Sequence, residues 1–275
     1  NFEIPYKLCL LCGHLNGAYQ DTNAFAKKLY NQEDGKNYSK NYLDDYNQRV
    51  NKIYAPKVDF LNKVIKKKLK IIDLGCGGGH FIKALEMKKI SAIGYETSKE
   101  LCSLGNKKLK KNKILLTSLN EIYQLPMKEK KANTLSLIHV LEHLVEPDKL
   151  MNSFVRSKLK YLYIAVPLFS LTTFIENSFP NIFPRQLSGG HTHLYTEKSL
   201  NYLVKKYNLK IIGEYWFGTD IPDLMRSLIN SGSITNKKIY AQQLKNKFSK
   251  FIDELQSILD KNKVCSEVHM VLEKK

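Results

Sequence analysis

The chain has 275 residues, of which 43% are hydrophobic and 25% are charged. A chain of this length buries a sizeable core without a disulfide or a structural metal. No apolar run approaches the roughly 20 residues of a membrane helix. No secretory signal opens the sequence, and we expect a cytoplasmic protein without a membrane span.

The formal net charge of +18 could mark a nucleic-acid binder. The lysines, however, fall mostly in short runs such as Lys66 to Lys68, which favours a solvated basic surface. Arginine, the preferred base-reading residue, occurs only at Arg49, Arg156, Arg185 and Arg226. We therefore expect no nucleic-acid partner.

The five cysteines are an odd, scattered set, which is typical of reduced thiols. Cys9 and Cys12 resemble half of a zinc knuckle, and His14 follows closely. A tetrahedral zinc site needs four ligands, and no second CxxC follows. The sequence therefore predicts no metal site and leaves open whether Cys9 and Cys12 bind a metal ion.

The order of elements predicts an α/β fold. Apolar spacing from Asn41 to about Lys68 indicates two consecutive helices, interrupted at Pro56. Short apolar runs then alternate with helix-like segments, as in a doubly wound sheet with right-handed crossovers. A polar helix is expected from about Lys237 to Leu259. The expected strands are 70–74, 90–95, 114–117, 134–139, 161–166, 209–216 and 265–272.

A glycine-rich loop from Asp73 to Gly79 joins the first of these strands to a helix. Glycines let the chain turn sharply and let a ligand approach the backbone. About 20 residues later Glu96 ends the next strand, where a carboxylate can accept both hydroxyls of a ribose. The dinucleotide motif GxGxxG needs a glycine at position 80, where this chain has His80, so a pyrophosphate is disfavoured.

The glycine loop resembles that of class I S-adenosylmethionine-dependent methyltransferases. The segment from Leu137 to Leu144, followed by Glu146 and Pro147, is similar to the ubiquinone-biosynthesis-like (methyltransferase 23 type) superfamily, including members from bacterial surface-glycan clusters. The resemblance spans roughly residues 38–220. It implies a Rossmann-like seven-stranded sheet, S-adenosylmethionine as cofactor and S-adenosylhomocysteine as product. Relatives acting on nucleotide-linked sugars often complete the N-terminal CxxC as a zinc site, which this sequence does not.

The cofactor residues follow from the glycine loop and from this resemblance. By resemblance, Ser118 and Leu119 contact the adenine, and Tyr42 or Arg49 closes over the cofactor. The full expected set is Asp73, Gly75, Cys76, Gly77, Glu96, Thr97, Ser118, Leu119, His139, Tyr42 and Arg49.

Methyl transfer needs an oriented acceptor, and a hydroxyl acceptor also needs a base. His139, Glu142 and His143 follow a strand at the edge where such sheets bind ligands. Family resemblance also suggests that Glu142 and His143 organise the loop and the helix after it. His191 and His193 are further candidate bases; alternatively, His193 caps the helix that starts near Thr196.

Residues 1–68 form an N-terminal extension, and 69–275 form the methyltransferase domain. An insertion at about 167–195 is expected to act as a lid and acceptor pocket, because long irregular segments are usually functional. Arg185 could bind a phosphate through two hydrogen bonds. The other expected acceptor contacts are Phe169, Tyr195 and Trp216.

The first functional hypothesis is O-methylation of a sugar, a nucleotide-linked sugar or a capsule precursor such as a phosphoramidate, as part of polysaccharide biosynthesis. An RNA methyltransferase and a non-catalytic cofactor-binding subunit are the alternatives. The sequence leaves the acceptor atom and the oligomeric state open.

Overall fold

The computed structural model describes residues 6–17, 45–179, 186–187, 191–231 and 236–275. These residues fall into two compact units. The sheet unit takes the described residues within 20–165, 203–213 and 270–275. The second unit takes those within 1–19, 166–202 and 214–269.

The seven strands of the main sheet lie in the order β5-β4-β3-β6-β7-β10-β9. The pairs β5-β4, β4-β3, β3-β6 and β6-β7 are parallel, which confirms the predicted doubly wound fold. After β5 the chain returns to the other side of β3, so the switch point lies between β3 and β6. The strands are β3 (Lys70–Leu74), β4 (Ser91–Glu96), β5 (Lys113–Leu116), β6 (Thr134–Ile138), β7 (Tyr161–Pro167), β9 (Leu209–Phe217) and β10 (Glu267–Lys274).

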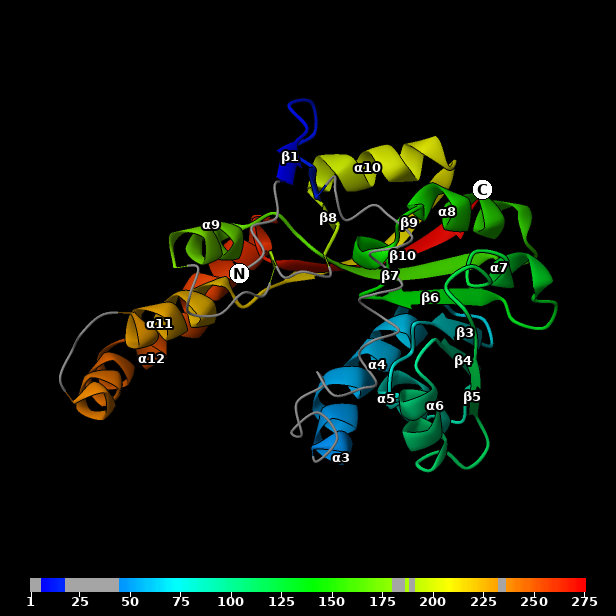
Figure 1. Cartoon of the computed structure of the whole chain (residues 1–275), viewed down its shortest axis with the longest axis horizontal. Helices are drawn as coiled ribbons and strands as arrows, with labels where there is room; N and C mark the ends of the chain where they lie inside the picture. Colours follow the sequence, from blue (N-terminus) through cyan, green and yellow to red (C-terminus); the bar gives the residue numbers. More distant parts are fainter. Residues whose placement is uncertain (1–5, 18–44, 180–185, 188–190, 232–235) are drawn as a thin grey trace. The chain divides into compact units, whose positions relative to one another are not determined.

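Helices cover both faces of this sheet. Helices α4 and α5 lie on one side and α8 lies on the other (Figure 1). On the first face, Val58, Leu61 and Leu85 are fully buried against the sheet residues Ile71 and Tyr163. The helices of this unit are α3 (Tyr46–Arg49), α4 (Ala55–Val64), α5 (His80–Met87), α6 (Lys99–Asn106), α7 (Leu125–Lys128) and α8 (Pro147–Arg156).

The helical region before β3 differs from the prediction. A π-helical turn, Val50–Tyr54, joins α3 to α4. Pro56 lies in the first turn of α4, which continues directly from the π-helical turn. The predicted interruption at Pro56 is therefore wrong, and the irregularity precedes the proline.

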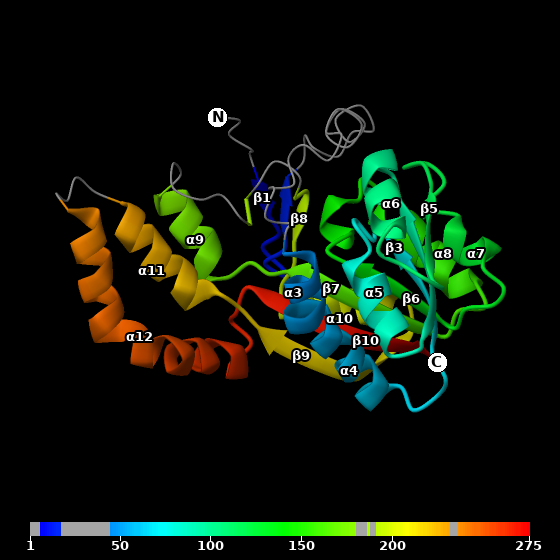
Figure 2. The same ribbon diagram turned by 90° about the horizontal axis from the view of Figure 1, so that it is seen from below.

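The second unit contains helices α9 (Leu171–Ser178), α11 (Asp220–Asn230) and α12 (Lys237–Lys261). Helix α11 lies between α9 and α12 (Figure 2). The buried Asp220 joins all three, because its Oδ1 accepts from the Ser170 hydroxyl (2.6 Å) and the Thr172 amide (3.1 Å), and Gln256 donates to its Oδ2 (3.4 Å).

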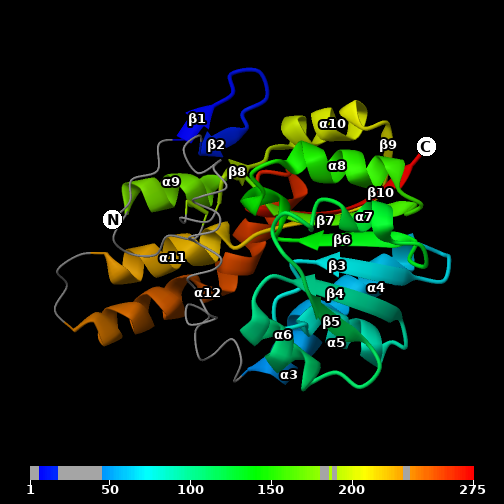
Figure 3. The same cartoon turned by 45° about the vertical axis from the view of Figure 1, so that its right-hand side comes forward.

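A small antiparallel sheet, which the sequence did not predict, also belongs to the second unit. It has the order β1-β2-β8, formed by Tyr6–Leu8, Leu15–Gly17 and His193–Leu194 (Figure 3). Helix α10 (Glu197–Lys206) follows β8. Across the described part of the chain, no helix is long and apolar enough to cross a membrane.

Asp220→Ala should unfold at lower urea concentration than the wild type, because the donors from Ser170 and Thr172 would stay buried without an acceptor. We expect a loss of roughly 1–3 kcal/mol in the free energy of unfolding. Asp253→Ala, on the exposed surface of α12, is the matched control. Equal unfolding midpoints for the two variants would contradict this role of Asp220.

Candidate active site

The loop after β3 holds a backbone shape that requires glycine. Gly75 has φ +65, and a Cβ at this position would lie 2.8 Å from the Val140 side chain. Its amide donates to the Tyr95 carbonyl of β4 at 2.8 Å. A side chain at Gly75 would therefore force the loop away from the strand tips.

The Glu96 carboxylate fixes the loop from the neighbouring strand. Its Oε2 accepts from the Gly77 amide (2.7 Å), and its Oε1 accepts from the amides of Thr97 (2.7 Å) and Ser98 (3.0 Å). The Thr97 hydroxyl also donates to Oε1 (3.2 Å), so four donors surround the carboxylate, about as many as it can accept. The ribose role of Glu96 and Thr97 stays a prediction, in which a ribose hydroxyl would replace the Thr97 hydroxyl as a donor to Oε1.

Asp73 lies at the base of the same loop and is 2% exposed. Its Oδ1 has no hydrogen-bond partner, and burial raises the pKa of this carboxyl to about 7. A buried acceptor without a donor is rare in folded proteins, and a ligand ammonium or N–H would satisfy it.

A stack of rings borders the loop on its helical side. The Tyr46 hydroxyl donates to the Gly79 carbonyl (3.1 Å), and the His80 ring lies 4.2 Å from the Tyr46 ring and 5.4 Å from the Tyr54 ring. Tyr46, which the sequence did not single out, thus contacts the glycine loop directly. Tyr42, which was predicted to close over the cofactor, lies outside the described residues. Arg49, the alternative prediction, is the last residue of α3, the helix that begins at Tyr46.

The other predicted cofactor residues lie at the same edge of the sheet. Ser118 follows β5 and is held by Glu121, whose Oε2 accepts from the Ser118 amide (3.1 Å) and hydroxyl (2.9 Å). Leu119 is the next residue, half-buried. Burial raises the pKa of the Cys76 thiol well above its usual value, so Cys76 contributes backbone and shape rather than a thiolate.

His139 and Glu142 form a pair just beyond the end of β6. His139 Nδ1 lies 3.1 Å from Glu142 Oε1; the imidazole is 40% exposed and the carboxylate is fully buried. His139 has φ +54, and its amide donates to the Ala165 carbonyl (2.9 Å). A buried carboxylate behind a partly exposed imidazole is the arrangement of an oriented general base. His143 lies in the same 3₁₀ turn, Leu141–His143.

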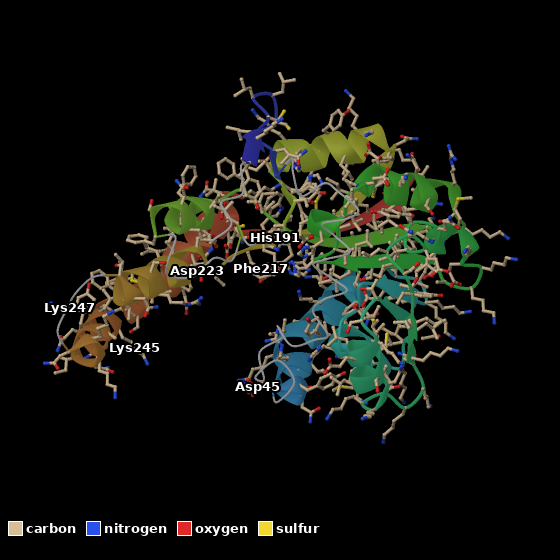
Figure 4. The ribbon with its side chains drawn as sticks, viewed as in Figure 1. Asp45, His191, Phe217, Asp223, Lys245 and Lys247 are labelled. Atoms are coloured by element: carbon tan, nitrogen blue, oxygen red, sulfur yellow. The ribbon has the colours of Figure 1, made fainter. Side chains whose placement is uncertain are left out.

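The remaining candidates belong to the second unit. His191, labelled in Figure 4, hydrogen-bonds through Nδ1 to the Gln186 carbonyl at 2.8 Å. His193 lies against His14, and Tyr195 is buried. Phe169 packs on Phe174. Arg185 lies outside the described residues.

Two further features of this unit correct or extend the sequence analysis. Thr196, not His193, caps α10: its hydroxyl accepts from the Ser199 amide (3.1 Å), and the Ser199 hydroxyl accepts from the Thr196 amide (2.9 Å). The Lys263 ammonium lies 4.9 Å from the Trp216 ring centre, so a cation already covers one face of this predicted acceptor contact.

Comparison with solved structures places this architecture among methyltransferases. A methyltransferase from Archaeoglobus fulgidus superposes with a TM-score of 0.51 at 16% identity, covering 80% of this chain and 92% of that one. The plantazolicin methyltransferase BamL gives 0.55 at 14% identity, with coverage of 90% and 94%. Magnesium protoporphyrin IX methyltransferase from Synechocystis PCC 6803 gives 0.50 at 12% identity, with coverage of 94% and 97%. At these identities the likeness shows the fold alone.

The fold and the loop geometry define a class I, Rossmann-like methyltransferase. The family described as "Methyltransferase domain" matches residues 46–214, and the chain belongs to this family. No curated protein matches the chain. S-adenosylmethionine is the cofactor, and the protein is an S-adenosylmethionine-dependent methyltransferase. The residues fit this cofactor: the unpartnered Asp73 oxygen suits its ammonium, and Glu96 suits its ribose.

Affinity for S-adenosylmethionine should rise as pH increases toward about 7 and then level off, because the ligand ammonium favours the ionised form of Asp73. Binding below this pH should release a proton from the carboxyl. Calorimetry in buffers of different ionisation enthalpy measures both effects. Asp73→Asn should bind more weakly and lose this proton release, whereas Asp59→Asn on exposed α4 should keep it. A pH profile that Asp73→Asn leaves unchanged would refute the assignment.

Proposed function

We propose that this methyltransferase methylates a hydroxyl oxygen of a small acceptor: a sugar, a nucleotide-linked sugar or a capsule precursor such as a phosphoramidate. The observation that carries the proposal is the His139–Glu142 pair, with 3.1 Å between Nδ1 and Oε1. A hydroxyl must lose its proton when its oxygen is methylated, whereas an uncharged amine already has a reactive lone pair. An oriented histidine base therefore favours an oxygen acceptor.

The protein's part in the reaction is to hold the acceptor and to take its proton. Bound S-adenosylmethionine supplies an electrophilic methyl group. His139 accepts the hydroxyl proton at Nε2, while Nδ1 donates to Glu142 and the buried carboxylate stabilises the imidazolium. Since the imidazole is 40% exposed and the carboxylate is not, the acceptor can reach the base without displacing its partner.

The left-handed backbone at His139 supports the same assignment. A φ of +54 is uncommon for a residue other than glycine. Such conformations cost free energy and occur frequently at functional sites. Here the turn places a polar side chain directly after a buried strand, at the sheet edge that carries the glycine loop and Glu96.

The acceptor itself is proposed from chemistry rather than from the fold. One similar solved structure, BamL, is a complex with a plantazolicin analogue, and another is a magnesium protoporphyrin IX methyltransferase. The same fold therefore serves chemically unlike acceptors. Phe169, Tyr195, Trp216 and Arg185 remain the proposed acceptor contacts, and His143, His191 and His193 remain the alternative bases.

Reduced thiols support a cytoplasmic location, because all five cysteines are free.

His139→Gln should lower kcat by roughly 10²–10⁴-fold, because the proton of the hydroxyl would have no acceptor at that position. Release of S-adenosylhomocysteine in the presence of a panel of nucleotide-linked sugars and sugar phosphates measures the rate. Glu142→Gln should lower kcat less and shift its pH profile, since the base remains but loses its buried partner.

His143→Gln distinguishes the proposed base, His139, from the histidine in the 3₁₀ turn that follows it. A loss of kcat in this variant, with full activity in His139→Gln, would contradict the proposed base. Activity on amine acceptors with none on hydroxyl acceptors would contradict the proposed acceptor class.

A further inference from the structure

Helices α11 and α12 lie in the connection between β9 and β10, which are neighbours in the main sheet. This connection spans residues 218–266. Most connections between elements of a compact domain have only a few residues. The sheet therefore does not need these helices to close, and their surface is free for another purpose.

One face of α12 carries a row of large apolar side chains, called the apolar stripe below. The stripe consists of Phe248, Phe251, Leu255 and Ile258, which follow one another at intervals of three, four and three residues. These residues are 42%, 43%, 42% and 55% exposed. Their spacing is that of a helix that packs lengthwise on another helix. A contiguous row of exposed apolar side chains marks an interaction surface.

A different face of α12 packs on the rest of the second unit. Gln256 is 7% exposed, and its Oε1 accepts from the Ile221 amide of α11 at 2.9 Å. Its Nε2 donates to Asp220 at 3.4 Å. Successive residues of a helix point about 100° apart, so Gln256 and its neighbour Leu255 face different directions. Helix α11 thus packs beside the apolar stripe and leaves it exposed.

The charges along α12 fall into two blocks. The basic block comes first, and all acidic residues of the helix follow it. The basic block is Lys237, Lys238, Lys245, Lys247 and Lys250, and the acidic residues are Asp253, Glu254 and Asp260. A parallel second α12 would bring like charges together. An antiparallel one would place the basic block of each helix beside the acidic residues of the other.

We propose that the apolar stripe binds a second copy of this chain, with the two α12 helices antiparallel about a two-fold axis. In such an interface both chains use the same surface, so each stripe covers the other. Phe248 and Phe251 lie at its centre. Lys247, labelled in Figure 4, precedes Phe248, and Glu254 precedes Leu255, so both border the stripe on the same side. Lys247 of each copy pairs with Glu254 of the other.

The position of Glu254 argues against a lipid surface as the occupant of the stripe. An amphipathic helix that lies on an anionic membrane is rich in lysine and arginine on its polar face. Glu254 is exposed at the border of the stripe, where its carboxylate would meet anionic headgroups. In the antiparallel dimer the same carboxylate meets an ammonium group instead.

Sedimentation velocity of the purified full-length protein measures its mass in solution. We expect a dimer with twice the chain mass of 31.8 kDa. Phe251→Asp should raise the dissociation constant of the dimer by roughly 100-fold or more, because the two-fold axis places two carboxylates in the apolar centre. Ile239→Asp is the matched control and should stay dimeric, since Ile239 is 62% exposed on α12 but lies outside the stripe. Circular dichroism and cofactor calorimetry check that each variant folds.

Charge reversal tests the antiparallel arrangement. Lys247→Glu and Glu254→Lys should each weaken the dimer, because each variant places like charges side by side. An equimolar mixture of the two variants should dimerise again, since one chain then supplies two acidic side chains and the other supplies two basic ones.

Three outcomes would overturn the proposal: a monomeric wild type, a dimer that Phe251→Asp leaves intact, or single charge variants that stay monomeric when mixed. A monomeric wild type that sediments with phosphatidylglycerol vesicles would assign the stripe to a membrane instead. None of these outcomes bears on the proposed methyl acceptor.

Discussion

The hydrogen bond from the Gly77 amide to the Glu96 carboxylate is the constraint on which the cofactor site depends. It joins the loop after β3 to the end of β4, next to the point where the strand order reverses. Because Glu96 also accepts from the amides of Thr97 and Ser98, its side chain is held in place before a ligand binds. A preorganised carboxylate loses little conformational entropy when it receives the ribose.

Two buried carboxylates at this edge of the sheet, Asp73 and Glu142, have different surroundings. Asp73 is buried without a donor to one oxygen, so it favours a cationic ligand. Glu142 is buried too, but it has an imidazole partner, so it favours a proton on His139. Asp73 on β3 and Glu142 in the turn after the neighbouring strand β6 thus have different partners. In the proposed mechanism, Asp73 binds the cofactor ammonium and Glu142 supports proton transfer by His139.

Apolar runs and glycine spacing, which are local features of the sequence, made the order of strands and helices predictable. Contacts between residues far apart in the sequence could not be predicted. The strand-to-glycine transition at residues 70–79 and the spacing to Glu96 identify the cofactor edge from the sequence alone. Tyr46 was missed because its role depends on one hydroxyl reaching the Gly79 carbonyl, which helical spacing does not reveal. The pairing of His14 with His193 was missed because β8 has only two residues, too few for a periodic pattern.

The central claim is that Glu96 holds the ribose of S-adenosylmethionine. Calorimetric titration of the wild type, Glu96→Ala and Glu100→Ala with S-adenosylmethionine tests it most directly; Glu100 is a nearby glutamate in the first turn of α6. The account predicts that Glu96→Ala loses roughly 1.5–3 kcal/mol of binding free energy, about a 10- to 150-fold weaker Kd. Glu100→Ala should bind as the wild type does. Equal affinity in all three proteins, or wild-type binding of NAD in place of S-adenosylmethionine, would contradict the account.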